Sequence, residues 1–111
     1  MKFLIIVSAS DAETVWNAFR FASTCTTYDN EVTLFLLGQG VEAPTLSTIK
    51  FDINEQIDIF REQGGKIIGC GVCCESRKDT MPQLEQELNC ELGSMQQLYA
   101  LSAEADKLVT F

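Results

Sequence analysis

The chain has 111 residues, of which 46% are hydrophobic and 22% are charged. This length and composition predict one globular domain, residues 1–111, that can bury a core of its own. With 16 acidic and 8 basic side chains the formal net charge is −8, which disfavours nucleic acids and anionic membranes as direct partners.

The chain contains five cysteines and no histidine. The longest apolar run, Phe3 to Val7, is far shorter than the ~20 residues that span a bilayer, and one lysine precedes it. We therefore expect a cytoplasmic protein with reduced thiols rather than a disulfide framework. The absence of histidine excludes Ser-His and Cys-His nucleophile pairs and histidine-ligated metals, so a reactive cysteine here needs another means of activation.

The first part of the chain predicts a strand, a helix and a second strand. Residues 2–7 form a continuous β-branched and aromatic run, typical of a buried strand in a parallel sheet. Ser10 and Glu13 make a capping box, and apolar residues then recur at helical spacing to about Thr26. Residues 31–37 predict a second buried strand, which completes a βαβ unit.

The pattern weakens over residues 38–52, where we expect a loop with one short helical turn in residues 45–51. Such a loop at the end of a strand is a candidate wall of a site. A helix with one apolar face follows from Ile53, and the Gly64–Gly65 pair ends it. The third strand comes directly afterwards.

The last third of the chain predicts two more helices and two short strands. Pro82 suits the first turn of a helix, and residues 90–92 suit a short fourth strand. Ser94 and Gln97 form a second capping box, and residues 107–111 are a final strand. Strands that alternate with helices predict an α/β fold in three layers, α/β/α, with a mostly parallel five-stranded sheet.

The chemistry of the chain is concentrated where the third strand ends, at Cys70. In an open α/β sheet, binding and catalysis collect at the carboxyl ends of strands. Gly69 and Gly71 flank the cysteine, so backbone amides can approach its sulfur. Amides and the dipole of the following helix, with Arg77, would favour the thiolate, which is the nucleophile. Cys70 as a small buried hydrophobe is an equally supported interpretation.

Cys73 completes a Cys-x-x-Cys with Cys70, a spacing that serves dithiol redox chemistry and metal binding. A zinc site made of these two with Cys74 and Cys90 is weakly indicated, because a second tight pair is absent. Thioredoxin-type chemistry is a better rival, although the aromatic residue and proline that flank such motifs are missing. Cys74 is interpreted as auxiliary or structural, and Cys25 and Cys90 as packing residues.

Two further features near the strand ends are candidates for auxiliary roles. Gly38, Gln39 and Gly40 can offer backbone amides to an anion, but two glycines around a glutamine are not a dinucleotide fingerprint. Arg77 has two interpretations: it orients an anionic sulfur or a partner's carboxylate, or it is a solvated surface residue. No bound cofactor and no metal are expected.

The whole chain resembles the DsrE/DsrF-like sulfur-relay proteins, a group that includes the Tus proteins of tRNA thiolation. The matching features are residues 2–7, residues 32–38 with Val41, Cys70 seven residues before Arg77, and the ending at residues 105–111. The chain departs from the family pattern at Cys74, which has no counterpart that we can place, and at Lys78, where many relatives have glycine.

The resemblance implies a DsrEFH-like fold and a sulfur carrier, or sulfurtransferase, that needs no cofactor. Cys70 would take up sulfane sulfur as a persulfide and pass it on, and Cys73 would resolve the persulfide by attacking its inner sulfur. Cys74, Arg77, Gly38 and Gln39 would be auxiliary. The implied partners are sulfur donor and acceptor proteins, in homotrimers or homohexamers. A non-catalytic assembly subunit and a Cys-x-x-Cys dithiol redox protein remain open as alternatives.

Overall fold

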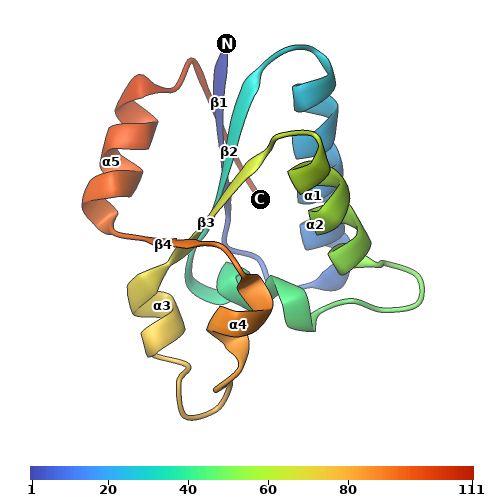
Figure 1. Cartoon of the computed structure of the whole chain (residues 1–111), viewed down its shortest axis with the longest axis vertical. Helices are drawn as coiled ribbons and strands as arrows, with labels where there is room; N and C mark the ends of the chain where they lie inside the picture. The colour runs from blue at the N-terminus through green and yellow to red at the C-terminus, as the bar shows by residue number, and fades with distance from the viewer.

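The computed structural model describes all residues, 1–111, as a five-stranded, wholly parallel sheet between helices (Figure 1). The strands are β1 (Lys2–Val7), β2 (Glu31–Leu36), β3 (Lys66–Cys70), β4 (Glu91–Gly93) and β5 (Lys107–Thr110). Their order across the sheet is β4-β3-β2-β1-β5. The predicted α/β fold is therefore confirmed.

Five α-helices and one 3₁₀ helix surround the sheet. They are α1 (Ala12–Thr27), η1 (Gly38–Thr45, the 3₁₀ helix), α2 (Ile53–Glu62), α3 (Gly71–Glu75), α4 (Leu84–Leu88) and α5 (Met95–Glu104). Helices α1 and α2 lie on one face of the sheet and α5 on the other, while α3 and α4 lie at its lower end in Figure 1. None of the helices combines the length and the apolar character needed to cross a bilayer.

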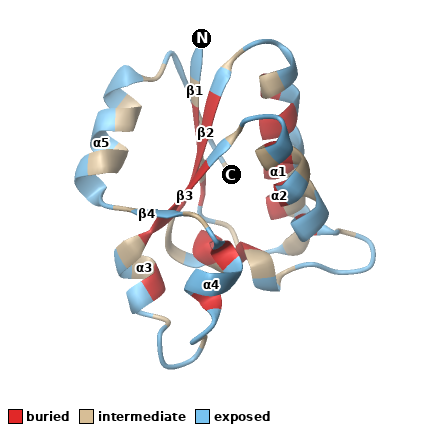
Figure 2. Cartoon of the chain, viewed as in Figure 1, coloured by how far each residue is buried: buried red, intermediate tan, exposed pale blue.

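Most of the core lies between the sheet and the α1–α2 layer, and it continues to α3 and α4 at the end of the sheet, as the buried segments in Figure 2 show. Phe19 of α1 and Phe60 of α2 are fully buried and meet edge to face, with ring centroids 6.2 Å apart. Strand β2 is buried from Val32 to its end, as expected of a central strand covered on both faces. Helix α5, in contrast, has no buried residue, so the layer on its side is thin.

Helix α1 is capped by Asp11 rather than by Ser10, so the capping box predicted at Ser10 and Glu13 is wrong. The Asp11 carboxylate accepts the N–H of Thr14 at 3.0 Å. Hydrogen bonds from the Thr14 hydroxyl and amide lower the pKa of Asp11. Ser10 lies one residue outside the helix, where its hydroxyl donates to Gln39 at 2.9 Å. Asp11 caps the helix in place of Ser10 because a carboxylate is a stronger acceptor than a hydroxyl for the free N–H groups of the first turn.

The helical turn between β2 and α2 occupies residues 38–45, as η1, rather than residues 45–51 as predicted. Gly38 has φ +57°, a left-handed conformation that turns the chain out of β2. Gly40 is buried so closely against the Val7 carbonyl that a Cβ atom there would collide with it. These two glycines hold η1 against the carboxyl end of β1, a tertiary contact that local periodicity does not reveal.

The last two helices agree only in part with the sequence signals. Pro82 does not open a helix, because turns continue after α3 and α4 begins at Leu84. The Ser94 hydroxyl accepts the N–H of Gln97 at 3.2 Å, which confirms the predicted cap of α5. The Gln97 side chain, however, hydrogen-bonds to Glu91 at 2.6 Å and not to the backbone N–H of Ser94, so the second hydrogen bond of the predicted capping box is not formed.

Candidate functional site

The candidate site lies at the carboxyl end of β3, where Cys70 caps the short helix α3. Its sulfur accepts the backbone N–H of Cys73 at 3.3 Å. The position at the strand end agrees with the sequence prediction, but only 4% of Cys70 is exposed. Cys70 is therefore enclosed by its surroundings and does not itself present an open thiol.

Cys73 is the more accessible thiol of the motif. It is half-buried, and its sulfur lies 2.6 Å from the sulfur of Cys70. The backbone N–H of Gly38, at the start of η1, donates to the Cys73 sulfur at 3.1 Å. The loop after β2 and the turn after β3 thus meet at one edge of the sheet, and Gly38 contributes to the site as an amide donor.

The electrostatic environment of Cys70 differs from the expectation of an activated thiolate. Burial raises the pKa of the Cys70 thiol, and the contact with Cys73 raises it further. The N–H groups of Cys73 and Val72 act in the opposite direction, but they are the smaller effects. The two amides act on Cys70 as predicted, but desolvation of a charged sulfur outweighs them and the pKa of Cys70 is raised overall, as expected of the buried residue that the sequence also allowed.

Arg77 does not contact either sulfur. Its Nε donates to the Glu42 carboxylate at 2.7 Å, and its Nη1 donates to the Cys73 carbonyl at 3.0 Å. The two charged side chains are only 19% and 21% exposed. The guanidinium therefore neither contacts an anionic sulfur nor extends into solvent, but joins α3 to η1 within the chain. Its predicted role toward a partner's carboxylate stays a prediction.

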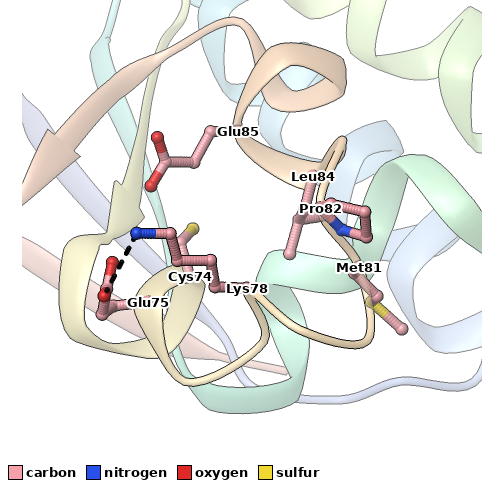
Figure 3. A pocket seen from close by; sticks show the side chains of 7 residues that line it. All are labelled: Cys74, Glu75, Lys78, Met81, Pro82, Leu84 and Glu85. Carbon is pink, nitrogen blue, oxygen red and sulfur yellow. Dashed lines mark ion pairs between the residues drawn. The ribbon is translucent and has the colours of Figure 1, made fainter.

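Cys74 lies beside a cavity of about 210 Å³ between α3 and α4 (Figure 3). The cavity is lined by Cys74, Glu75, Lys78, Met81, Pro82, Leu84 and Glu85. Burial, with the Glu85 carboxylate nearby, raises the pKa of Cys74 to about 11. This thiol is therefore protonated near neutral pH, which supports a structural role.

The comparisons with known proteins agree with this fold. The model of the DsrE/DsrF-like family matches residues 1–111. The chain belongs to the DsrE/DsrF-like family. An uncharacterized protein of Methanocaldococcus jannaschii is 29% identical to it over 116 residues, which cover 100% of both chains. A solved structure, a conserved protein of unknown function from Bacteroides thetaiotaomicron, has a TM-score of 0.76 at 18% identity and covers 99% of this chain and 94% of that one. This second likeness concerns the fold alone.

The other predicted residues of this DsrE/DsrF-like chain lie outside the pair. The Gln39 side chain is exposed and bonded to Ser10. Cys25 is buried in the core, and Cys90 packs beside Gly69. The four cysteines considered for zinc are not arranged as a metal site, since no group of three or more possible ligands converges.

One residue of the site was missed by the sequence analysis, namely Glu42. It lies in the segment where the periodicity is weakest, and nothing in its neighbours marks it. Its importance follows only from the ion pair with Arg77, 35 residues away in the sequence. Pairing between such distant charges depends on the strand order, which no local pattern shows.

Proposed function

We propose that this DsrE/DsrF-like protein carries sulfane sulfur as a persulfide on its Cys70–Cys73 pair and passes it to a partner protein. The observation that supports the proposal most is the close pairing of one enclosed and one accessible thiol, 2.6 Å apart, at the carboxyl edge of the sheet. The chemistry needs no cofactor, because the nucleophile and the carrier are both cysteine sulfur.

Cys73, the accessible thiol, suits the step in which sulfur is transferred from a donor protein. The thiolate of Cys73 attacks the outer sulfur of a donor persulfide, R–S–SH, and the donor leaves as the thiolate R–S⁻. Cys70 then takes the outer sulfur from Cys73 in the same kind of exchange, which is neither an oxidation nor a reduction overall. Storage on the enclosed Cys70 shields the persulfide from solvent thiols, and reversal of the two steps delivers the sulfur to an acceptor thiolate.

Mass measurement of the intact protein tests this proposal. After incubation with a sulfane-sulfur donor, the wild-type protein should gain ~32 Da for each stored sulfur, and a reducing thiol should remove it. Cys73→Ser should load poorly, because sulfur enters through Cys73, and Cys70→Ser should load but lose its sulfur faster. Cys74→Ser is the matched control and should behave as wild type. Loading of the Cys70→Ser/Cys73→Ser double variant at the wild-type level would overturn the proposal.

The same pairing of thiols also favours a second candidate, a dithiol redox protein. In that case Cys70 and Cys73 would form a reversible two-electron couple and would retain no sulfur. The loading experiment separates the two functions, because a redox protein treated with the donor would lose ~2 Da, as two thiols become a disulfide, instead of gaining a sulfur. A non-catalytic subunit would show neither change.

Self-association belongs to the same proposal. Leu92, Met95, Tyr99 and Leu108 are exposed on β4, α5 and β5, although they are large and apolar. Burying such side chains against other copies of the chain is favourable. We expect a homotrimer or homohexamer, and native mass spectrometry should show three or six chains rather than one.

A further inference from the structure

We propose that the Glu42–Arg77 ion pair is a positioning device that holds the N–H of Gly38 on the sulfur of Cys73. Its biological use rests on the proposed function, because only a relay that begins at Cys73 needs a reactive thiol there. In this assignment Glu42 and Arg77 touch no sulfur and act through the backbone of η1 and α3.

The contacts of Arg77 connect the two segments that form the sulfur–amide pair. On one side its Nη1 binds the carbonyl of Cys73, the residue that carries the sulfur. On the other side its Nε binds Glu42, which lies in η1, the 3₁₀ helix that begins with the donor Gly38. One guanidinium therefore connects the segment that carries the acceptor with the segment that carries the donor of the 3.1 Å hydrogen bond.

The other hydrogen bonds of η1 anchor both of its ends, and at the far end the Asn54 side chain of α2 donates to the Pro44 carbonyl at 3.1 Å. The Leu37 N–H donates to the Val7 carbonyl at 2.9 Å, and Gly40 packs against the same carbonyl. These contacts place η1 at the end of β1 but do not tie it to α3. Because the Glu42–Arg77 pair is mostly shielded from solvent, it is screened less than an exposed ion pair and suits this task.

The charged and titratable groups around Cys73 allow a rival explanation, in which the Arg77 charge acts directly on the sulfur. The groups are Cys70 from β3, Glu42 from η1, and Cys74, Glu75 and Arg77 from α3 and the turn after it. The two explanations predict opposite effects on the stability of the Cys73 thiolate when Glu42 is removed. An unpaired Arg77 would stabilise a Cys73 thiolate more strongly by charge alone, whereas loss of the Gly38 hydrogen bond would stabilise it less.

Alkylation of Cys73 by iodoacetamide, measured across pH in the Cys70→Ser variant and quantified on its peptide, decides between them. Glu42→Ala should slow alkylation at neutral pH by about ten-fold, the lower end of what one lost hydrogen bond to a charged group is expected to cost, and move the profile to higher pH. Glu42→Gln keeps a neutral acceptor for Arg77 and should recover part of the rate. Glu75→Ala is the matched control. It also removes one negative charge, this time from α3, but the ion pair of Glu75 is with Lys78, at 3.8 Å, and not with Arg77.

Alkylation that becomes faster or stays unchanged in Glu42→Ala, as in Glu75→Ala, would overturn the proposal. Thermal unfolding shows whether each variant is folded. If Glu42→Ala is not, then Arg77→Lys takes its place, since lysine keeps the charge but cannot hold Glu42 and the Cys73 carbonyl in one planar fork. The slower alkylation is expected there too, and an unchanged rate would contradict it. No sulfur donor is involved, so failed persulfide loading with the predicted alkylation shift would reject the relay and keep the positioning role.

Discussion

The sulfur of Cys73 lies 2.6 Å from the sulfur of Cys70, although Cys70 is enclosed and Cys73 reaches the surface. The first thiol that a reagent or a partner meets is therefore the second cysteine of the motif. This relationship has a direct consequence for the oxidation of the motif.

Mild oxidation should join Cys70 to Cys73 within one chain, because the sulfurs need little movement to reach the disulfide separation of ~2.05 Å. Diamide should lower the intact mass by ~2 Da and protect both cysteines from later alkylation. Cys73→Ser should abolish this change, and Cys74→Ser should preserve it. Disulfide-linked pairs of chains, in place of an internal bridge, would contradict the prediction.

Stability should fall in alkaline solution, in part because of Cys74. Its pKa is raised from 9.0 to about 11 by burial, so the unfolded chain loses this proton at lower pH than the native protein does. The contribution is complete below about pH 9 and is lost as the pH rises through about 11, at up to ~1.4 kcal/mol per pH unit.

Urea denaturation with a reductant present, at about pH 8 and about pH 10, measures this loss. Cys74→Ala should lose less stability between the two pH values than wild type does. The loss in Cys74→Ala has to be subtracted from the loss in wild type, because burial also raises the pKa of Cys25, Cys70 and Cys90, which both proteins contain. Equal losses in the two proteins would show that Cys74 titrates normally.

Gly40→Ala should destabilise the protein more than Gly38→Ala does. A Cβ at position 40 would strike the backbone of Val7, which cannot move without displacing β1, and we expect a cost of about 2–3 kcal/mol. A Cβ at position 38 meets nothing within 4 Å, so only the left-handed backbone resists it, at about 1 kcal/mol. Denaturant midpoints of the two variants give the order, and a reversed order would disprove the packing of η1 described above.

The cap of α1 distinguishes Asp11 from Ser10. Asp11→Ala removes the acceptor of the Thr14 N–H and should lower the melting temperature by about 3–6 °C. Ser10→Ala removes only an exposed hydrogen bond to Gln39 and should change the melting temperature by less than about 2 °C. Thermal unfolding followed by circular dichroism measures both melting temperatures. Equal shifts would contradict the assignment of Asp11 as the cap of α1.

The elements with continuous local patterns were predicted correctly from the sequence. The apolar runs of β1, β2 and β3 and the apolar face of α2 depend on neighbours a few residues away, and Gly64, at φ +89°, ends α2 where the glycine pair indicated. The placement of Cys70 at a strand end followed from the same signals. The errors at Ser10 and at residues 45–51 arose where a nearby residue or a tertiary contact offered a better arrangement than the local motif.

The solvent access and the hydrogen-bond partners of Cys70 and Cys73 depend on the tertiary structure alone. Parallel pairing of β2 with β3 brings the segments after both strands to one edge of the sheet, and only there do Gly38 and Glu42 reach Cys73 and Arg77. At that edge Cys70 is buried, whereas Cys73 is only half-buried. A sequence carries the identity and the local spacing of its cysteines, whereas solvent access and hydrogen-bond partners depend on residues some 35 positions away, whose approach is a property of the folded chain.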